Sequence, residues 1–165
     1  MFVLQKQFVK PQYQINPSQY FSQSKTTLFV YEFFQTWRLL NKINDELFSR
    51  LEIPFPVIVT IGYQTDLRFD VISRTFDYTP VLPDGSKPLD ERGRKGGGAD
   101  LFAKFIEMKI KPKTESFVPI NKQHQTIWGH SYGGLFVLNT LFKHPEMFQN
   151  YVLRILRFGG KMVLF

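Results

Sequence analysis

The sequence predicts an α/β fold with a mainly parallel sheet flanked by helices, and two kinds of segment predict it. The run Val57–Ile61 is β-branched without alternation, which is typical of a strand buried on both faces of a parallel sheet. Residues 37–51 and 99–111 carry apolar side chains at helical spacing, which predicts amphipathic helices. Strand-like and helix-like segments therefore alternate along the chain, in the order β-α-β-loop-α-β-α-β.

The N-terminal half follows this scheme from local patterns. Residues 1–26 are polar and Gln-rich without clear periodicity, so we expect irregular or weakly extended chain. The β-prone segment 27–31 predicts a strand, and the helix over 37–51 and the strand over 57–61 follow it. Residues 62–98, rich in Asp, Pro, Gly and charged residues, predict one long loop, which inside a compact domain is usually functional or mobile.

In the C-terminal half, the predicted helix over 99–111 ends at Pro112. Residues 126–128 form a short apolar segment, which predicts a buried strand. A helix is expected over 135–142, and the apolar segment 151–156 predicts a last strand.

Composition excludes several classes of function. The 165 residues suffice for one domain, and the 43% hydrophobic share allows a sizeable core. The absence of Cys excludes disulfides, thiol catalysis and Cys-ligated metals, and the three His have no metal-ligand spacing, so we expect neither metal nor cofactor. The net charge of +7 comes without a nucleic-acid motif, so we expect no nucleic-acid partner. The oligomeric state is left open.

The N-terminus and the hydropathy bear on location. No apolar run approaches the ~20 residues that a membrane span needs, and the N-terminus lacks the pattern of a signal peptide. We therefore expect no membrane span and a cytoplasmic protein, or a periplasmic one if the sequence has lost a signal.

The chemistry is concentrated in Gly129-His130-Ser131-Tyr132-Gly133, a complete G-x-S-x-G between a predicted strand and a predicted helix. In that context Ser131 is a candidate nucleophile; the alternative is a glycine turn with a bystander serine. Gly129 and Gly133 would keep side chains out of the crowded turn. The backbone N–H of Tyr132 would form half of an oxyanion hole.

The other half of the oxyanion hole is expected from the turn after the preceding core strand, at Gly62 and Tyr63. A catalytic base is harder to find. We expect the His130 side chain to point away from the serine, and His124 and His144 to lie at the ends of elements. After the serine, the only carboxylate and the only histidine lie just past the predicted helix. We therefore assign no catalytic His and no catalytic acid in this chain.

Three blocks together resemble a known family: Ile61–Pro80, Gly93–Phe102 and Ile127–Leu138. They are similar to the esterase D-like branch of the α/β-hydrolases, and within it to siderophore trilactone esterases, which hydrolyse enterobactin- and salmochelin-type macrolactones. The resemblance implies a serine esterase of carboxylic esters that works through an acyl-enzyme at Ser131. Its partner would be a small-molecule ester, an anionic catecholate siderophore in this case, with iron arriving on the substrate.

The resemblance also implies that Arg74 binds the anionic substrate, whereas from the residues alone Arg74 is better explained as paired with Asp77 or solvated. Arg92, Arg94 and Lys95 would add attraction for an anion, but a solvated loop is the simpler interpretation.

The similarity covers residues 40–150, while 1–39 and 151–165 are atypical. The family continues with further strands and a late catalytic histidine. We therefore interpret residues 1–165 as a single partial α/β-hydrolase domain, truncated or frameshifted, with its C-terminal strands missing. Two alternatives remain open: a catalytically impaired remnant, and a thioesterase or acyltransferase on the same fold.

Overall fold

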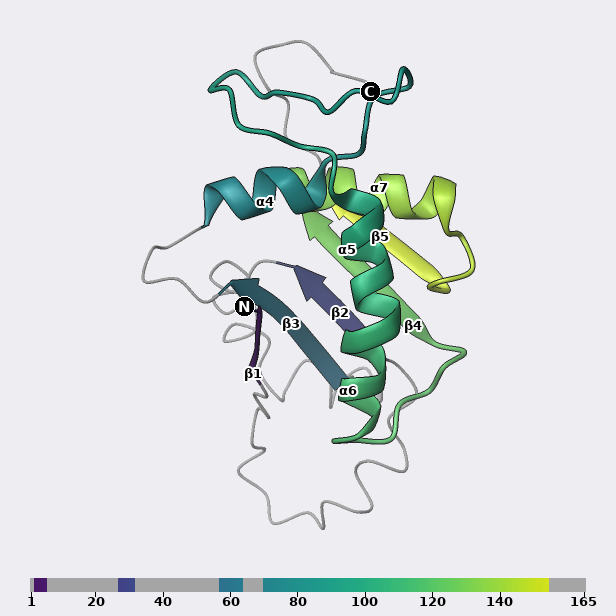
Figure 1. Ribbon diagram of the computed structural model, residues 1–165. Coiled ribbons are helices and arrows are strands. Elements are labelled where there is room, and N and C mark those ends of the chain that lie inside the picture. The colour runs from purple at the N-terminus through teal and green to yellow at the C-terminus, as the bar shows by residue number, and fades with distance from the viewer. Residues whose placement is uncertain (1, 6–26, 32–56, 64–69, 155–165) are drawn as a thin grey trace.

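The computed structural model describes residues 2–5, 27–31, 57–63 and 70–154, and these residues form a twisted sheet with helices packed on it (Figure 1). The strands are hydrogen-bonded in the order β1-β3-β2-β4-β5. All neighbours pair in parallel except β1, which is antiparallel to β3. The predicted α/β fold with a mainly parallel sheet is confirmed. The strands are β1 (Phe2–Gln5), β2 (Thr27–Tyr31), β3 (Val57–Tyr63), β4 (Gln125–His130) and β5 (Asn150–Arg154).

The described helices contact one another. Helix α4 packs against both α5 and α7, and α5 packs against α7. Helix α5 continues without a break through a π-helical turn, η1, into α6, and this rod runs in front of the sheet in Figure 1. The bounds are α4 (Val71–Tyr78), α5 (Ala99–Phe105), η1 (Ile106–Ile110), α6 (Lys111–Glu115) and α7 (Tyr132–Lys143).

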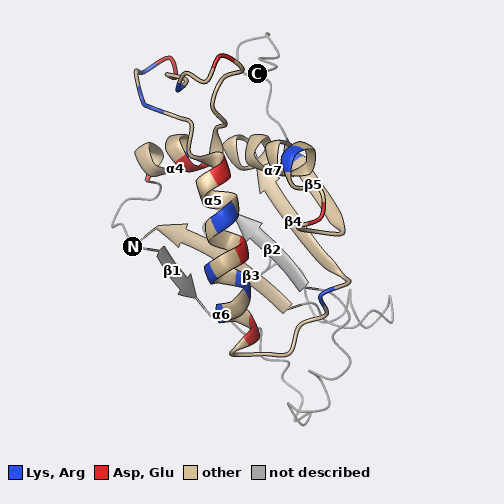
Figure 2. Ribbon diagram, turned by 45° about the vertical axis from the view of Figure 1, so that its right-hand side comes forward, with Lys and Arg blue, Asp and Glu red and all other residues tan. Residues whose placement is uncertain are grey.

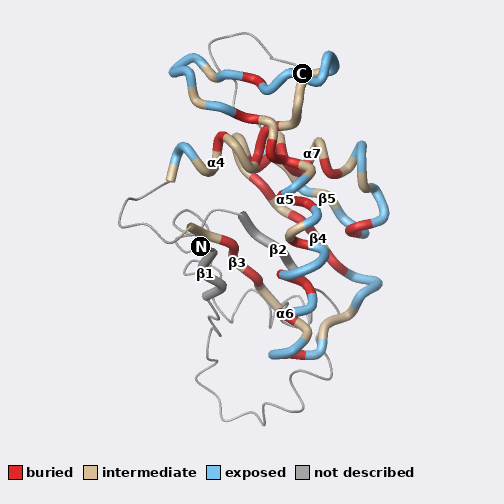
Figure 3. Tube along the Cα trace, viewed as in Figure 1, coloured by how far each residue is buried: buried red, intermediate tan, exposed pale blue. Residues whose placement is uncertain are grey.

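The core lies where these helices meet β3 and β4 (Figure 3). Three aromatic rings from three helices form its centre: the centroids of Tyr78 and Phe102 are 5.5 Å apart, and Phe136 lies 5.1 Å from Phe102 and 6.0 Å from Tyr78. Their edge-to-face and tilted arrangement is the one that aromatic pairs prefer. Buried Val59 and Ile127 of the sheet complete the contact.

The predictions of the strands over 27–31, 57–61 and 126–128 are confirmed, and so is the helix over 135–142. The last strand is confirmed as far as Arg154. Of the N-terminal segment, residues 2–5 are strand β1. The remainder of that segment and the predicted helix over 37–51 lie outside the described residues.

The prediction of a single loop over 62–98 is wrong, because it contains α4. Asp70 caps this helix by accepting from the N–H of Ser73 at 2.9 Å. The inward face of α4 is built around Thr75 and Tyr78, while Ile72 is 71% exposed. The segment has only eight residues, and its apolar Val71 and Ile72 are exposed, so its burial does not follow its apolar side chains.

Pro112 does not end the rod, contrary to the prediction. It lies at the first turn of α6, where a missing N–H costs little, and the π-helical turn η1 directly precedes it. Acidic and basic residues alternate along the outer side of this rod (Figure 2). Among the described residues, no helix is long and apolar enough to cross a bilayer.

Candidate active site

Ser131 lies in a sharp turn between β4 and α7, and its backbone is strained. Its φ of 57° and ψ of −122° belong to a region that favours glycine. It is the one residue other than glycine with a positive φ in the part of the chain that the structure describes. Such a conformation costs about 1–3 kcal/mol and persists only where the surroundings enforce it. A strained serine at the carboxyl end of a parallel strand is the local geometry of a nucleophile elbow.

Backbone bonds on both sides enforce this turn. The N–H of Ser131 donates to the carbonyl of Arg154 on β5 at 2.8 Å, and the N–H of Leu135 donates to the carbonyl of Ser131 at 3.1 Å. The first bond ties the turn to the neighbouring strand. The second begins the hydrogen-bond ladder of α7.

Missing side chains make the turn sterically feasible. A Cβ on Gly129 would lie 2.2 Å from the carbonyl oxygen of Gly133, so β4 and α7 approach each other here as closely as backbones can. This contact leaves no room for a side chain at Gly129. Gly133 contributes its carbonyl to this contact. At the next glycine, Gly134, a Cβ would lie 2.9 Å from the carbonyl oxygen of Arg154.

The N-terminus of α7 points at the serine. Tyr132 is the first residue of this 12-residue helix, so its N–H points out of the N-terminal end of the helix. The helix dipole adds partial positive charge at the same place. An oxygen that becomes negative beside Ser131 would be stabilised by both.

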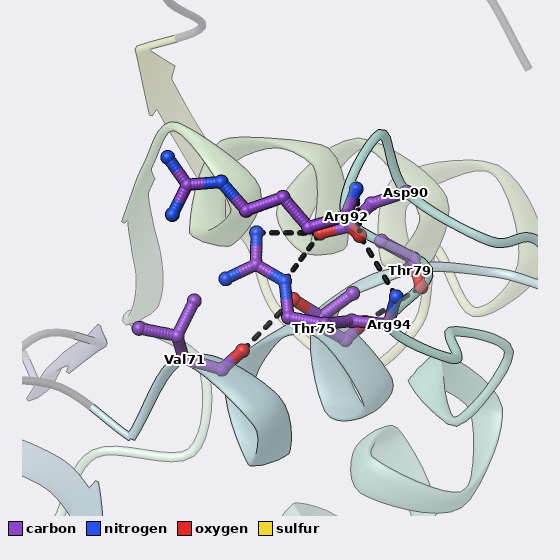
Figure 4. A network of polar contacts seen from close by, with 6 residues as sticks. All are labelled: Val71, Thr75, Thr79, Asp90, Arg92 and Arg94. Atoms are coloured by element: carbon purple, nitrogen blue, oxygen red, sulfur yellow. Dashed lines mark hydrogen bonds and ion pairs between the residues drawn. The ribbon is translucent and has the colours of Figure 1, made fainter.

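The Tyr132 side chain meets a tight turn of the loop between α4 and α5. Asp90 accepts from the backbone N–H groups of Arg92 and Arg94, both at 2.9 Å, and from the guanidinium of Arg94 at 2.5 Å (Figure 4). Burial and the charge of Asp90 raise the pKa of the Tyr132 phenol, against an opposing effect of Arg94. The side chains of Arg92 and Lys95 are exposed, whereas Arg94 is held by Asp90.

The base of this loop is fixed to the end of α4. The N–H groups of Gly97 and Ala99 both donate to the carbonyl of Thr79 at 3.1 Å, and the N–H of Gly98 donates to the carbonyl of Phe76 at 2.8 Å. The hydroxyl of Thr79 also accepts from Gly97. The loop therefore leaves and rejoins the helical layer at one place, beside the elbow.

Gly62 and Tyr63, expected to form the second half of the oxyanion hole, lie on a strand that does not adjoin the elbow strand. Gly62 and Tyr63 are the last residues of β3, paired with β1, rather than a turn. Strand β2 lies between β3 and β4, so the end of β3 is two strand spacings, roughly 9–10 Å, from the elbow strand. The strand bonded directly to β4 is β2, which ends at Tyr31, and the residues that follow it lie outside the described residues. The order of the strands in the sheet therefore sets the distance between Gly62 and Tyr63 and the elbow.

Arg74 lies on α4, which packs against the elbow helix α7. Its guanidinium carbon is 5.7 Å from the centroid of the Tyr78 ring. Burial lowers its pKa, and its charge interacts with Tyr132 and with His130, the two neighbours of the nucleophile. The carboxylate of Asp77 accepts a hydrogen bond from Tyr63 instead, at 2.8 Å. Pairing of Arg74 with Asp77 is therefore not the arrangement found.

The three histidines lie just before β4, at its last residue and just after α7. His124 precedes β4 and is exposed, and His144 follows α7, 4.0 Å from Glu146. Because α7 is about 18 Å long, His144 is far from Ser131. The ring of His130 stacks on Trp128, with centroids 6.5 Å apart, and burial together with Arg154 and Arg74 lowers its pKa.

No group of His, Asp and Glu residues suited to a metal ion occurs among the described residues.

A parallel sheet with a strained serine between a strand and a helix defines part of an α/β-hydrolase. The chain belongs to the family described as "Putative esterase", whose model matches residues 17–153. It is 44% identical to an apo-salmochelin esterase of Escherichia coli O6:H1, over 62% of this chain and 33% of that protein. It is 46% identical to the ferri-bacillibactin esterase BesA of Bacillus subtilis, over 58% of this chain and 34% of that protein.

Solved structures agree with this assignment. The enterobactin and salmochelin hydrolase IroE superposes with a TM-score of 0.60 at 35% identity, over 86% of this chain and 51% of that one. The BES protein from Bacillus cereus gives a TM-score of 0.67 at 28% identity, over 93% of this chain and 60% of that one. The chain thus spans about a third of the length of these curated relatives and half or more of these solved chains.

Proposed function

We propose that this chain carries the nucleophile of a serine esterase that acts on siderophore-type esters. The observation that carries the proposal is the backbone of Ser131, strained between β4 and α7 with a helix N-terminus behind it. The close approach at Gly129 and the hydrogen bond to Arg154 hold this strained backbone in place. In a nucleophile elbow, a strained backbone of this kind exposes the serine Oγ to the substrate.

In the proposed reaction, the Ser131 Oγ attacks the carbonyl carbon of an ester and gives up its proton to a base. The N–H of Tyr132 stabilises the resulting oxyanion, the alcohol leaves, and water then hydrolyses the acyl-enzyme. The base is not assigned to His124, His130 or His144. We assign no second oxyanion donor among the described residues.

A siderophore substrate is supported by two features. The names of the relatives are those of siderophore esterases. The charge of Arg74 lies beside both neighbours of Ser131, and a guanidinium is well suited to an anionic aromatic acyl group. Thioesters and acyl transfer use the same elbow, so the substrate itself must be tested.

The test is labelling by a fluorophosphonate probe, read by intact mass, in the folded chain and in Ser131→Ala. We expect one adduct in the first and none in the second. The proposal would be overturned if the folded wild-type chain were not labelled, or if Ser131→Ala were still labelled. A panel of a catecholate trilactone, neutral aryl esters and thioesters then distinguishes the substrate classes. Preference for a thioester would contradict the siderophore assignment.

A further inference from the structure

Tyr63 lies away from the elbow strand, and its side chain contacts helix α4 instead. Its hydroxyl donates to the Asp77 carboxylate at 2.8 Å, and its ring lies 6.4 Å from the ring of Tyr78. This hydrogen bond joins the end of β3 to the last turn of α4. It is half-buried, where water competes less with the donor and acceptor.

Helix α4 is short, and although the carbonyls of Phe76 and Thr79 bind the loop at its end, few of its side chains fix it to the sheet and the other helices. It has only eight residues, and its buried residues are Thr75 and Tyr78. The hydroxyl of Thr75 bonds within the helix, to the carbonyl of Val71 at 2.8 Å, so it does not fix the helix to its neighbours. Tyr78 alone enters the aromatic centre of the core. One buried side chain holds a helix in place, but the helix can still rotate about its own axis around that side chain.

The Tyr63–Asp77 bond supplies a second anchor, at the residue next to Tyr78. Arg74 precedes these residues by three and four positions, so Arg74, Asp77 and Tyr78 share one face of α4. A rotation of the helix would therefore move the guanidinium of Arg74 away from the elbow. Burial and its neighbours raise the pKa of the Tyr63 phenol, so this side chain keeps the proton that it donates.

We propose that Tyr63 and Asp77 are positioning residues: their hydrogen bond fixes the rotation of α4 and thereby holds Arg74 beside His130 and Tyr132. The interpretation of Arg74 as a substrate-binding residue rests on the proposed function, but its placement does not. The hydrogen bond requires an acceptor oxygen at position 77 and does not require the negative charge of Asp77. Asn at position 77 keeps an acceptor oxygen, whereas Phe at position 63 removes the donor.

The placement can be measured without any activity, because burial, Arg154 and Arg74 together lower the pKa of His130. We would titrate the histidines by NMR in the wild type, Arg74→Met, Tyr63→Phe and Asp77→Asn. Arg74→Met should raise the pKa of His130. Tyr63→Phe should raise it toward the Arg74→Met value, and Asp77→Asn should leave it unchanged. Asp100→Asn, which breaks an ion pair on α5, serves as the matched control with no effect on His130.

Two results would overturn the positioning role: a wild-type His130 pKa in Tyr63→Phe, or an Asp77→Asn variant that behaves like Arg74→Met. If Tyr63→Phe does not fold, Asp77→Ala can be used instead, because it removes the acceptor of the same hydrogen bond. The pKa of His130 should then rise in Asp77→Ala as well.

Binding of salicylate, with neutral salicylamide for comparison, tests the ligand. Arg74→Met and Tyr63→Phe should each weaken salicylate binding roughly ten- to hundredfold, the range expected from losing one charge-assisted hydrogen bond, and leave salicylamide binding within about twofold. Unchanged salicylate binding in Arg74→Met would refute anion binding in the proposed function, and the His130 titration would still decide the positioning role. Loss in Arg74→Met without loss in Tyr63→Phe would overturn the positioning role.

Discussion

Replacing Gly129 by Ala should be the most damaging single-methyl change in the described residues around the elbow. The new Cβ would lie 2.2 Å from the carbonyl oxygen and 2.4 Å from the carbonyl carbon of Gly133. Real Cβ atoms essentially never approach closer than 3.0 Å, so the two backbones must separate by at least 0.8 Å. Neither partner is a side chain that can rotate away. Overpacking of this kind costs about 3 kcal/mol or more, a large share of the roughly 5–15 kcal/mol that stabilises a domain.

The assay is urea unfolding followed by circular dichroism, together with the rate of fluorophosphonate labelling. Gly85→Ala is the matched control, because no atom lies within 4 Å of its new Cβ and only its φ of 80° is unfavourable. That variant should lose about 1 kcal/mol and label normally. Gly129→Ala should lose about three times as much and label at least tenfold more slowly, because Ser131 would shift. A Gly129→Ala variant as stable as Gly85→Ala, with wild-type labelling, would refute the close approach of β4 and α7.

Three further predictions concern stability. Ser131→Gly should be more stable than Ser131→Ala by about 1 kcal/mol in urea unfolding, because only glycine relieves the positive φ; equal stabilities would contradict the strain. Burial raises the folded-state pKa of Asp77 above its unfolded value, so the folded chain binds more protons and loses stability as the pH rises from about 4 through the folded pKa. Asp77→Asn should not show this loss and should be more stable than the wild type at pH 7. If the stability of both proteins changed with pH in the same way, the prediction would be wrong. Lys111 is buried and donates to the carbonyl of Met147 at 2.5 Å, so Lys111→Met should cost about 1–3 kcal/mol, whereas exposed Lys113→Met should cost under about 0.5 kcal/mol.

The elbow could be predicted from sequence because all of its determinants are local. The apolar strand, Ser131, the glycines and the helix behind them are consecutive, and each has its own pattern. The parallel sheet could also be predicted, since Val57–Ile61 has the unbroken apolar character of a strand covered on both sides. Arg74 was found by resemblance alone, because nothing in its neighbours' periodicity distinguishes it.

Other features escaped prediction for identifiable reasons. Helix α4 has only eight residues, and it buries Thr75 and Tyr78 while Ile72 stays exposed, so an apolar count does not reveal which side faces the core. The turn η1 depends on how the rod accommodates Pro112, which no propensity scale describes. In both cases the deciding term is packing against other elements, which local sequence does not contain.

The sequence by itself determined the class of fold and the presence of a strained serine turn, because both depend on residues that are neighbours along the chain. Only the tertiary structure decided which strands adjoin. It put β2 between β3 and β4, took Gly62 and Tyr63 away from the oxyanion position, and brought Tyr63 to Asp77 instead. Strand order and side-chain contacts between distant segments result from the free energy of the whole core, which no single segment encodes.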